Sequence, residues 1–554
     1  MKKIILPLLL FALVSIVSWS QNLTVTMTTA GTLSTLLPDD LSSYDGLTIK
    51  GDINGTDLLA IYAIDSDTAL HIATLDLSAA NIVAGGDAYF RYMGIEYYTV
   101  DNEVSQYMFK ARKFRKLVLP NSVTKIGYSG MSGFRGVEVI LGNGLKAIDD
   151  YGLSDMSQVT AITVPERVDS MGRCALGYNK NLEKVVLPIQ LKELADGIFQ
   201  FDTKLTQVVI PAAVERLGAS AFFDCESLED ITVPASVKVI GHNAFASCYK
   251  LASIDVDPAN RYYSTIDGVL YNKDATQLVR YAIAKPETEF AIPNSVTSIA
   301  GDAFWESALE KITMGDNVTE LDSLGYTFYA CKQLKEIRLS DAITYLPTHV
   351  LASCEQLATV VLPKRLAHLG ESAFMSSGLK GIVIPEGVDT IPIHCFQTCN
   401  SLEEVTLPST MKYLDGNAFG YDYALRNITV KAVTPPECEW EEYEVWDDDD
   451  PNYGEEGTGH MVGYSTSFND VDTLAVTLKV PAGSLEAYKQ HRVWKAFVNT
   501  VALGNETGVI GVQAVDPDVE IARYSVDGVR LDAPAQGLNI IRYRSGKTRK
   551  VWVK

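Results

Sequence analysis

The chain has few basic residues for its length. It contains 47 lysines and arginines against 69 aspartates and glutamates in 554 residues, which gives a formal net charge of −22 at pH 7. Binding to nucleic acid requires clustered positive charge, so this balance excludes nucleic acid as the main partner. It also excludes a basic peripheral membrane binder. Hydrophobic residues make up 47% of the chain, which excludes bulk disorder, because disordered chains have low hydrophobicity.

Sequence motifs that carry catalysis or hold cofactors are also missing. The seven histidines are dispersed and form no His-Glu-x-x-His pair, and neither Gly-x-Ser-x-Gly nor Gly-x-x-x-x-Gly-Lys occurs. No Cys-x-x-Cys pair offers zinc ligands. We therefore predict no enzyme activity, no catalytic residue, no cofactor and no metal site. A pair of carboxylates cannot be recognised in a sequence, so a glycosidase stays open without support.

Long apolar runs are confined to the N-terminus, so we expect no integral membrane span in the mature chain. Met1-Lys2-Lys3 precedes an apolar run over Ile4–Val17, and small residues follow at Ser18 and Ser20. This order predicts a secretory signal peptide over residues 1–20, the alternative being an N-terminal core strand or helix.

The rest of the chain is dominated by an internal repeat of 22 or 23 residues. Leu182–Pro188, Leu205–Pro211 and Leu228–Pro234 share the form Leu-x-x-apolar-x-apolar-Pro, and fourteen copies lie between Phe114 and Lys431. Apolar residues two apart predict a strand with one buried face, which the proline ends. A second motif, Val-x-x-Ile-Gly-x-x-Ala-Phe, follows and places a phenylalanine in one column of the repeats. One copy cannot bury its apolar face alone, so the copies are predicted to stack into a solenoid.

These units resemble the BspA-type leucine-rich repeats of bacterial surface proteins. Val480–Tyr488 with Trp494–Phe497 is similar to the closing cap of such proteins, and Leu47–Asp57 is similar to their opening region. The basic end, through Tyr524–Gly528 and Gly537–Ile541, resembles the sorting domains of type IX secretion. The resemblance implies a cell-surface or extracellular location and binding to host or matrix proteins or to other cells. It does not imply an enzyme.

The expected fold is an α/β-type repeat solenoid, mostly β and irregular, with leucine-rich repeats of 22–23 residues and one short strand each. A small all-β C-terminal tail is expected to follow. The expected organisation is residues 1–20 signal peptide, 21–105 N-terminal capping region, 106–434 leucine-rich-repeat solenoid, 435–470 acidic insertion, 471–504 last repeat and C-terminal cap, 505–520 linker and 521–554 sorting-like β tail. The segment Pro258–Glu289 is predicted to add a hairpin to the solenoid.

Five cysteines recur three residues after the phenylalanine column. They are Cys225, Cys248, Cys331, Cys354 and Cys399, and Asn179 takes the same place in another copy. A buried thiol column that meets backbone groups is the favoured interpretation. Disulfides between neighbouring coils, Cys225–Cys248 or Cys331–Cys354, remain geometrically possible, because in-register coils lie roughly 5 Å apart.

The acidic insertion carries eleven carboxylates between Glu437 and Glu456, interleaved with aromatic residues that include Trp440 and Trp446. A block of like charge is usually a solvated loop. The alternatives are a recognition loop for a basic partner or a weak Ca²⁺ site, since oxygen ligands suit a hard cation. The two tryptophans are candidate ligand-binding residues, because Trp is a frequent binding anchor.

The strongest candidate site is the column of strand residues that faces away from the core. Twelve of its fourteen members are uncharged and eleven are β-branched. The column comprises Val118, Ile140, Thr163, Val186, Val209, Thr232, Asp255, Ala291, Thr313, Arg338, Val361, Val383, Thr406 and Thr429. Strand propensity alone explains such residues, and an extended ligand-binding sheet surface explains them equally well. We name Val186, Val209, Thr232, Asp255, Thr313, Arg338, Val361 and Val383 as candidate ligand contacts.

The sequence therefore predicts a secreted leucine-rich-repeat protein at the outer-membrane surface of a Gram-negative bacterium or outside the cell. Its expected partner is an extracellular or host protein, or a glycan, bound by the sheet face, as in an adhesin or interaction scaffold. The competing interpretations are a passive surface or periplasmic scaffold without a dedicated ligand and a non-catalytic glycan-capture component.

Overall fold

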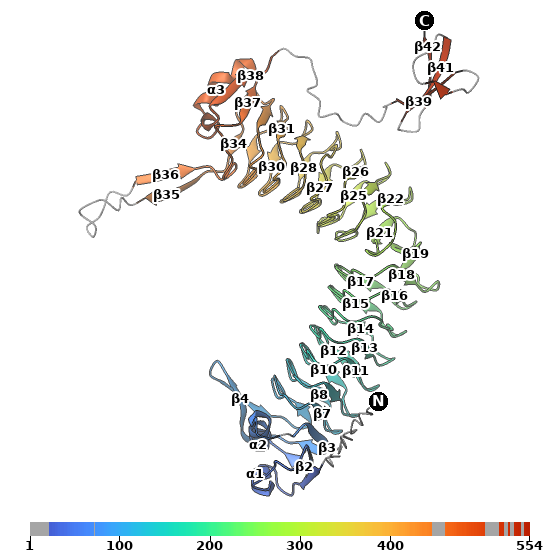
Figure 1. Cartoon of the computed structure of the whole chain (residues 1–554), viewed down its shortest axis with the longest axis vertical. Helices are drawn as coiled ribbons and strands as arrows, with labels where there is room; N and C mark the ends of the chain where they lie inside the picture. Colours follow the sequence, from blue (N-terminus) through green and yellow to red (C-terminus); the bar gives the residue numbers. More distant parts are fainter. Residues whose placement is uncertain are drawn as a thin grey trace, which may run out of the picture. The chain divides into compact units, whose positions relative to one another are not determined.

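The computed structural model describes residues 21–70, 72–445, 460–504, 520–525, 530–531, 537–543 and 548–553. The predicted signal peptide and the greater part of the predicted linker therefore lie outside the described residues. The chain forms two compact units, and segments from residues 289–331 belong alternately to one unit and the other. Unit 1 comprises residues up to 288, 294–309 and 320–331, and unit 2 comprises residues 289–293, 310–319 and 332 onward. Stacked coils of mostly short strands build both units (Figure 1), as the sequence predicts.

Each coil of unit 1 contributes a strand in which buried and outward residues alternate. In β13, Lys184 and Val186 are exposed on either side of the buried Val185. The strands of this kind are β1 (Asn22–Thr26), β2 (Gly46–Ile53), β3 (Thr74–Ile82), β7 (Lys116–Val118), β9 (Glu138–Ile140), β11 (Ala161–Thr163), β13 (Lys184–Val186), β16 (Asp230–Val233) and β18 (Ser253–Val256). The hydrogen-bonded neighbours among them pair in parallel, with Leu75 opposite Leu117 and Thr163 opposite Val186.

A second strand of two residues follows in most coils and is the main departure from the predicted one strand per repeat. In unit 1 these strands are β6 (Glu103–Val104), β8 (Lys125–Ile126), β10 (Ala147–Ile148), β12 (Ser170–Met171), β14 (Glu193–Leu194), β15 (Arg216–Leu217), β17 (Val239–Ile240), β23 (Ser298–Ile299) and β25 (Glu320–Leu321). They fall on the Val-x-x-Ile motif, whose last residue is buried in every one of these strands except β17, while the residue before it faces outward. The periodicity of so short a segment is too weak to indicate a strand.

The N-terminal part of unit 1 contains two helices, α1 (Leu33–Leu36) and α2 (Gly55–Ser66). Asn54 caps α2, and Asp57 completes the capping box while its carboxylate also accepts the Gly31 and Leu33 N–H groups at 2.6 and 2.9 Å. Two hairpins extend the coils. The first joins β4 (Gly85–Tyr92) to β5 (Ile95–Thr99), and the second, predicted within Pro258–Glu289, joins β19 (Tyr263–Ile266) to β20 (Val269–Asn272) before β21 (Gln277–Arg280).

Unit 2 repeats the same plan. Its outward-facing strands are β22 (Glu289–Ala291), β24 (Lys311–Thr313), β26 (Glu336–Arg338), β29 (Gly381–Val383), β31 (Glu404–Leu407), β33 (Asn427–Val430), β37 (Thr477–Val480) and β38 (Asn499–Ala502). Its second strands are β27 (Tyr345–Leu346), β28 (His368–Leu369), β30 (Thr390–Ile391), β32 (Tyr413–Leu414) and β34 (Glu437–Cys438). The antiparallel pair β35 (Glu441–Val445) and β36 (His460–Tyr464) follows β34.

The C-terminal part of unit 2 closes on short helices and strands. The helix α3 (Leu485–Gln490) lies between the 3-10 turns Ala482–Ser484 and Trp494–Ala496. The strands β39 (Glu520–Ser525), β40 (Arg530–Leu531), β41 (Gly537–Tyr543) and β42 (Thr548–Val553) form an antiparallel sheet in the order β40-β39-β41-β42, as expected of an all-β tail. Within the described residues, the repeats themselves carry no helix.

The phenylalanine column forms runs of stacked rings in the core of each unit. In unit 2 the rings of Phe374, Phe396 and Phe419 are nearly parallel, with centroids 5.2 and 5.3 Å apart. In unit 1 Phe199, Phe222 and Phe245 stack at 5.4 and 5.7 Å. Each ring fills the space between coils, so the column is the repeated packing device that the sequence predicts.

The cysteine column satisfies backbone carbonyls inside this core. The thiols of Cys225 and Cys248 donate to the carbonyl oxygens of Phe199 and Phe222, one coil earlier, at 3.2 and 3.1 Å. All eight cysteines are buried as thiols, which confirms the favoured interpretation over the inter-coil disulfides. Asn179 makes the equivalent bond, from its Nδ2 to the Leu153 carbonyl oxygen at 3.0 Å.

Candidate binding surfaces

The strand-face row of unit 1 consists of Val118, Ile140, Thr163, Val186, Val209, Thr232 and Asp255. All seven face outward, and six of them are exposed, while Val118 is half-buried. The exposed fraction is 42% for Val186 and 84% for Val209, while their strand neighbours Val185 and Val208 are buried. Lys184 bridges to Gln207 in parallel register, which places Val186 and Val209 side by side. The structure thus assembles the predicted residues of this unit into one outward row.

The strand-face row of unit 2 consists of Ala291, Thr313, Arg338, Val361, Val383, Thr406 and Thr429. Register places Thr313 opposite Arg338, and Arg338 bridges to Val361. Val361 and Val383 are 66% and 48% exposed. The guanidinium of Arg338 is held by its own unit, because it donates to the Met314 carbonyl oxygen at 2.6 Å and pairs with Asp316. The single basic residue of this row is therefore fixed in place.

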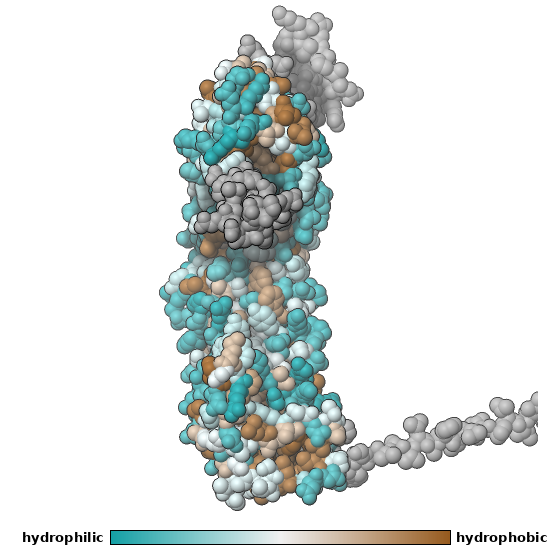
Figure 2. All heavy atoms as spheres, turned by 90° about the vertical axis from the view of Figure 1, so that its left-hand side faces the viewer, coloured by the Kyte–Doolittle hydropathy of each residue, from teal (hydrophilic) through white to brown (hydrophobic). Residues whose placement is uncertain are grey.

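Charged side chains border the strand-face rows. Residues two positions earlier on neighbouring strands form cross-strand ion pairs, Lys116 with Glu138 at 2.8 Å and Lys311 with Glu336 at 3.0 Å. Such exposed pairs add little stability, but they give each row a polar rim. Figure 2, which faces the left-hand side of Figure 1, shows hydrophobic residues there in small patches among hydrophilic ones.

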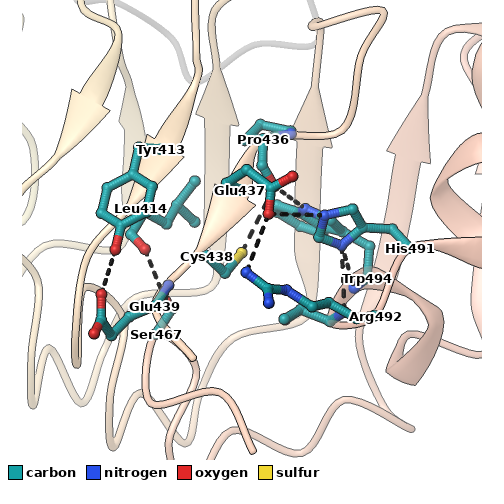
Figure 3. A network of polar contacts seen from close by, with 11 residues as sticks. Tyr413, Leu414, Pro436, Glu437, Cys438, Glu439, Ser467, His491, Arg492 and Trp494 are labelled. Carbon is teal, nitrogen blue, oxygen red and sulfur yellow. Dashed lines mark hydrogen bonds and ion pairs between the residues drawn. The ribbon is translucent and has the colours of Figure 1, made fainter. Parts of the chain in front are cut away.

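Trp440, the described tryptophan of the acidic insertion, is half-buried at the base of the β35–β36 hairpin. The guanidinium of Arg492 lies 5.3 Å from the centre of its ring, in the geometry of a cation–π contact. Arg492 also pairs with Glu437 at 3.3 Å, and the His491 Nε2 lies 3.7 Å from the same carboxylate (Figure 3). Burial lowers the pKa of His491, an effect that Glu437 opposes. Trp446, the other candidate, lies outside the described residues.

The predicted acidic insertion, residues 435–470, begins and ends with residues that belong to the core. Cys438 is buried in β34, and the Trp494 Nε1 donates to the Pro436 carbonyl oxygen at 2.7 Å (Figure 3). Phe468 continues the phenylalanine stack, with its ring 5.7 Å from that of Phe419. Deleting the whole segment would remove these core residues, so the interpretation as a solvated loop does not apply to either end.

Unit 1 also carries a row of half-exposed aromatic rings that the sequence did not predict. We call it the tyrosine ladder, and it runs from the β4–β5 hairpin onto the first coils. Tyr97 lies 5.4 Å from Tyr107, Tyr107 lies 6.0 Å from Tyr128, and Tyr128 lies 5.9 Å from Tyr151, all edge to face. Its members are Phe90, Tyr92, Tyr97, Tyr107, Tyr128 and Tyr151. The rings come from several repeat positions and from an insertion, so no single sequence period marks them.

Two acidic residues buried at the cysteine position were also missed. Asp202 and Asp422 are 0% and 1% exposed, and one oxygen of each accepts a backbone N–H of the preceding coil, from Asn179 and Cys399, at 2.7 Å. Burial raises the pKa of Asp422 to about 9 and that of Asp202 well above its usual range. These carboxyls are structural, because they stand in line with the thiols and with Asn179.

The described residues contain no group of three or more His, Cys, Asp or Glu side chains arranged to hold a metal ion. Among the helices of the described segments, none has the length and apolar character needed to cross a membrane.

Comparison with known proteins gives similar solved structures, and no curated protein matches the chain. A leucine rich cell surface protein from Faecalibacterium prausnitzii A2-165 is 28% identical, with 62% of this chain and 85% of that chain covered and a TM-score of 0.49. The pneumococcal vaccine antigen PcpA is 19% identical over 74% and 86%, with a TM-score of 0.44. A leucine-rich repeat protein from Bacteroides ovatus ATCC 8483 is 22% identical over 62% and 85%, with a TM-score of 0.40.

A family model gives the decisive match. The description "BspA type Leucine rich repeat region (6 copies)" matches residues 102–225, 192–326, 281–400 and 324–435. Together these matches span residues 102–435, which is more than half of the chain. They coincide with the coils that carry the phenylalanine and cysteine columns. The chain therefore belongs to the family of BspA-type leucine-rich-repeat proteins.

Proposed function

We propose that the chain is a secreted protein of the outer surface of a Gram-negative bacterium, where it binds an extracellular or host protein through its strand-face rows. The predicted signal peptide and the basic tail, with its similarity to type IX sorting domains, support this location. The family supports a role in binding, and neither the sequence motifs nor the described side chains suggest catalysis.

The observation that carries the proposal is an exposed row of uncharged residues between charged borders. Val209 is 84% exposed and Val361 66% exposed on strands whose alternate residues fill the core. Burial of one such valine side chain by a ligand is worth about 1.5 kcal/mol or more. Several in register provide an extended contact without a pocket, and the ion-paired rim provides specificity rather than affinity.

The test replaces the two adjacent row residues of unit 1 by lysine, as Val186→Lys with Val209→Lys. The matched control is Val100→Lys with Val239→Lys, two valines of the same unit that are each 49% exposed and lie outside the row. Binding of the purified chain to immobilised collagen, laminin and fibronectin, and to host-cell membrane proteins, is measured by surface plasmon resonance, with melting temperatures recorded for each variant.

We expect the row variant to bind at least about tenfold more weakly, because two apolar contacts are lost and two ammonium groups are desolvated. The control pair should bind as the wild type does. Equal binding by the row variant would discard the strand-face row as the binding surface. A wild-type chain that binds none of these proteins would favour the passive scaffold instead.

A further inference from the structure

The tyrosine ladder places aromatic side chains where the backbone disfavours them. The third residue after most of the second strands adopts positive φ, with Tyr107 at 63° and Tyr151 at 59°. Neighbouring coils place Ser129, Cys174 or Gly197 at this position. Bulky residues rarely adopt the left-handed conformation, although the coils also place Tyr178, Phe201, Tyr326 and Tyr421 in it. Neither tyrosine is fully buried, so packing of the core does not account for choosing an aromatic ring here.

A shallow polar depression adjoins the middle of the ladder. It has a volume of about 430 Å³ and is lined by Tyr128, Ile148, Asp149, Asp150, Ser170 and Gly172. Tyr128 is 42% exposed and therefore serves as both a rung of the ladder and a wall of the depression. Ile148 is the one aliphatic residue of the lining. The site thus combines an aromatic surface with hydrogen-bonding groups.

The two carboxylates of the depression are held in fixed positions. Asp149 pairs with the ammonium group of Lys125 at 2.7 Å, and one oxygen of Asp150 accepts the Arg173 N–H at 2.7 Å. Each carboxylate has about four acceptor sites on its two oxygens, so both can accept further hydrogen bonds from a ligand. Gly172 allows this arrangement, because a Cβ there would lie 2.4 Å from an Asp150 carboxylate oxygen.

We propose that the tyrosine ladder and this depression form a binding site for an extended polysaccharide whose sugars are neutral or carry amino groups. A pyranose ring presents C–H groups on its faces and hydroxyl groups around its edge. The C–H faces pack on aromatic rings, and the hydroxyls donate to fixed carboxylates. A row of successive rings matches a chain of successive sugars, and Asp150, the carboxylate that Lys125 does not neutralise, disfavours sulfated or uronate-rich chains by like-charge repulsion.

A peptide fits this surface less well. Peptide anchors are apolar or aromatic side chains that fill apolar pockets, whereas the depression offers Asp149, Asp150 and Ser170. The ladder shares no residue with the strand-face rows, so the polysaccharide site and the proposed protein-binding surface can be tested separately.

The experiment is affinity electrophoresis of the full chain through gels containing one soluble polysaccharide each. The probes are a mixed-linkage β-glucan, xylan, mannan and chitosan, with heparin as the anionic probe, and calorimetry gives the affinity for any probe that retards the chain. The variants are Tyr128→Ala, Tyr128→Trp and Asp150→Asn. Tyr423→Ala serves as the control, since this tyrosine is 57% exposed on unit 2.

We expect at least one neutral or amino-bearing probe to retard the chain, and heparin not to. Tyr128→Ala should weaken that binding roughly tenfold, as expected for loss of one aromatic contact, while Tyr128→Trp restores it and Tyr423→Ala leaves it unchanged. Asp150→Asn should weaken it severalfold, because a charged acceptor makes the stronger hydrogen bond. Val186→Lys with Val209→Lys should have no effect on it.

The proposal is overturned if no neutral or amino-bearing probe binds, if heparin binds best, or if Tyr128→Ala binds as the wild type does. A protein ligand that is lost in Tyr128→Ala but kept in the lysine variant of the strand-face row would instead make the ladder a protein-binding surface. Melting temperatures of the variants separate these outcomes from misfolding.

Discussion

Asp422→Asn is expected to stabilise the folded protein at neutral pH, because the native carboxyl must be kept protonated in the core. Asp422 is 1% exposed. One oxygen accepts the Cys399 N–H at 2.7 Å, and among the described residues the other oxygen has no hydrogen-bond partner. Asn179 shows that an amide fits this position, since its Oδ1 accepts the Met156 N–H at 2.6 Å and its Nδ2 donates to the Leu153 carbonyl at 3.0 Å.

The size of the effect follows from proton linkage. Burial raises the pKa of Asp422 from 3.8 to about 9. The hydrogen bond from the Cys399 N–H lowers this pKa, but its effect is smaller than that of burial. Between these values the unfolded chain releases a proton that the folded protein keeps, so the free energy of unfolding falls as pH rises. The contribution of Asp422 is fully present below pH 3.8 and lost above about pH 9. At about 1.4 kcal/mol per pH unit, the loss by pH 7 has a ceiling of about 4 kcal/mol.

The assay is differential scanning calorimetry of the wild type and Asp422→Asn from pH 4 to pH 9. The exposed Asp274→Asn serves as a control, because it removes the same charge without burial. We expect the melting temperature of Asp422→Asn to exceed that of the wild type by a margin that grows with pH. A variant that melts at or below the wild-type temperature at pH 8, with the same dependence on pH, would refute the reasoning.

Three further predictions concern the core and the hairpin. Phe396→Ala should lower the free energy of unfolding by about 3 to 5 kcal/mol, measured by denaturant titration, whereas Tyr423→Ala should change it by less than about 0.5 kcal/mol. All eight cysteines should react with a thiol reagent in denaturant without reductant. In the folded protein they should resist the reagent, because burial raises the pKa of thiols such as that of Cys248 to about 12. Fewer than eight reactive thiols in denaturant would indicate disulfides. Replacing 446–459 by a short Gly-Ser turn should leave the melting temperature unchanged, whereas deleting Pro435–Asn469 should lower it strongly; equal effects would contradict the placement of core residues at both ends.

Repetition explains how much of the fold the sequence predicts. The alternation in segments such as Lys184–Leu187 recurs so often that strand, buried face and phenylalanine column all follow from it. The strands β3 and β37, which lie beyond the fourteen copies, continue the same parallel pairing with β7 and β33. The two-residue strands were missed, because too few residues are present to show a period.

The candidate site is predicted only in part, for a different reason. Exposure of Val186 and Val209 follows from alternation along the strand, so the rows could be read from the repeat. The tyrosine ladder could not, since Tyr97 lies on an inserted hairpin and Tyr128 and Tyr151 occupy different repeat positions. The acidic pair Asp202 and Asp422 shares the cysteine column, but residue type alone did not reveal that carboxyls are buried there.

The most direct test of the central claim is the binding measurement on the strand-face row. The purified wild type, Val186→Lys with Val209→Lys, and Val100→Lys with Val239→Lys are compared on the same immobilised extracellular proteins, at equal melting temperature. We predict that at least one protein binds the wild type and the control pair equally and binds the row variant at least about tenfold more weakly. Equal affinity of all three for every ligand would contradict the claim that this row is the binding surface.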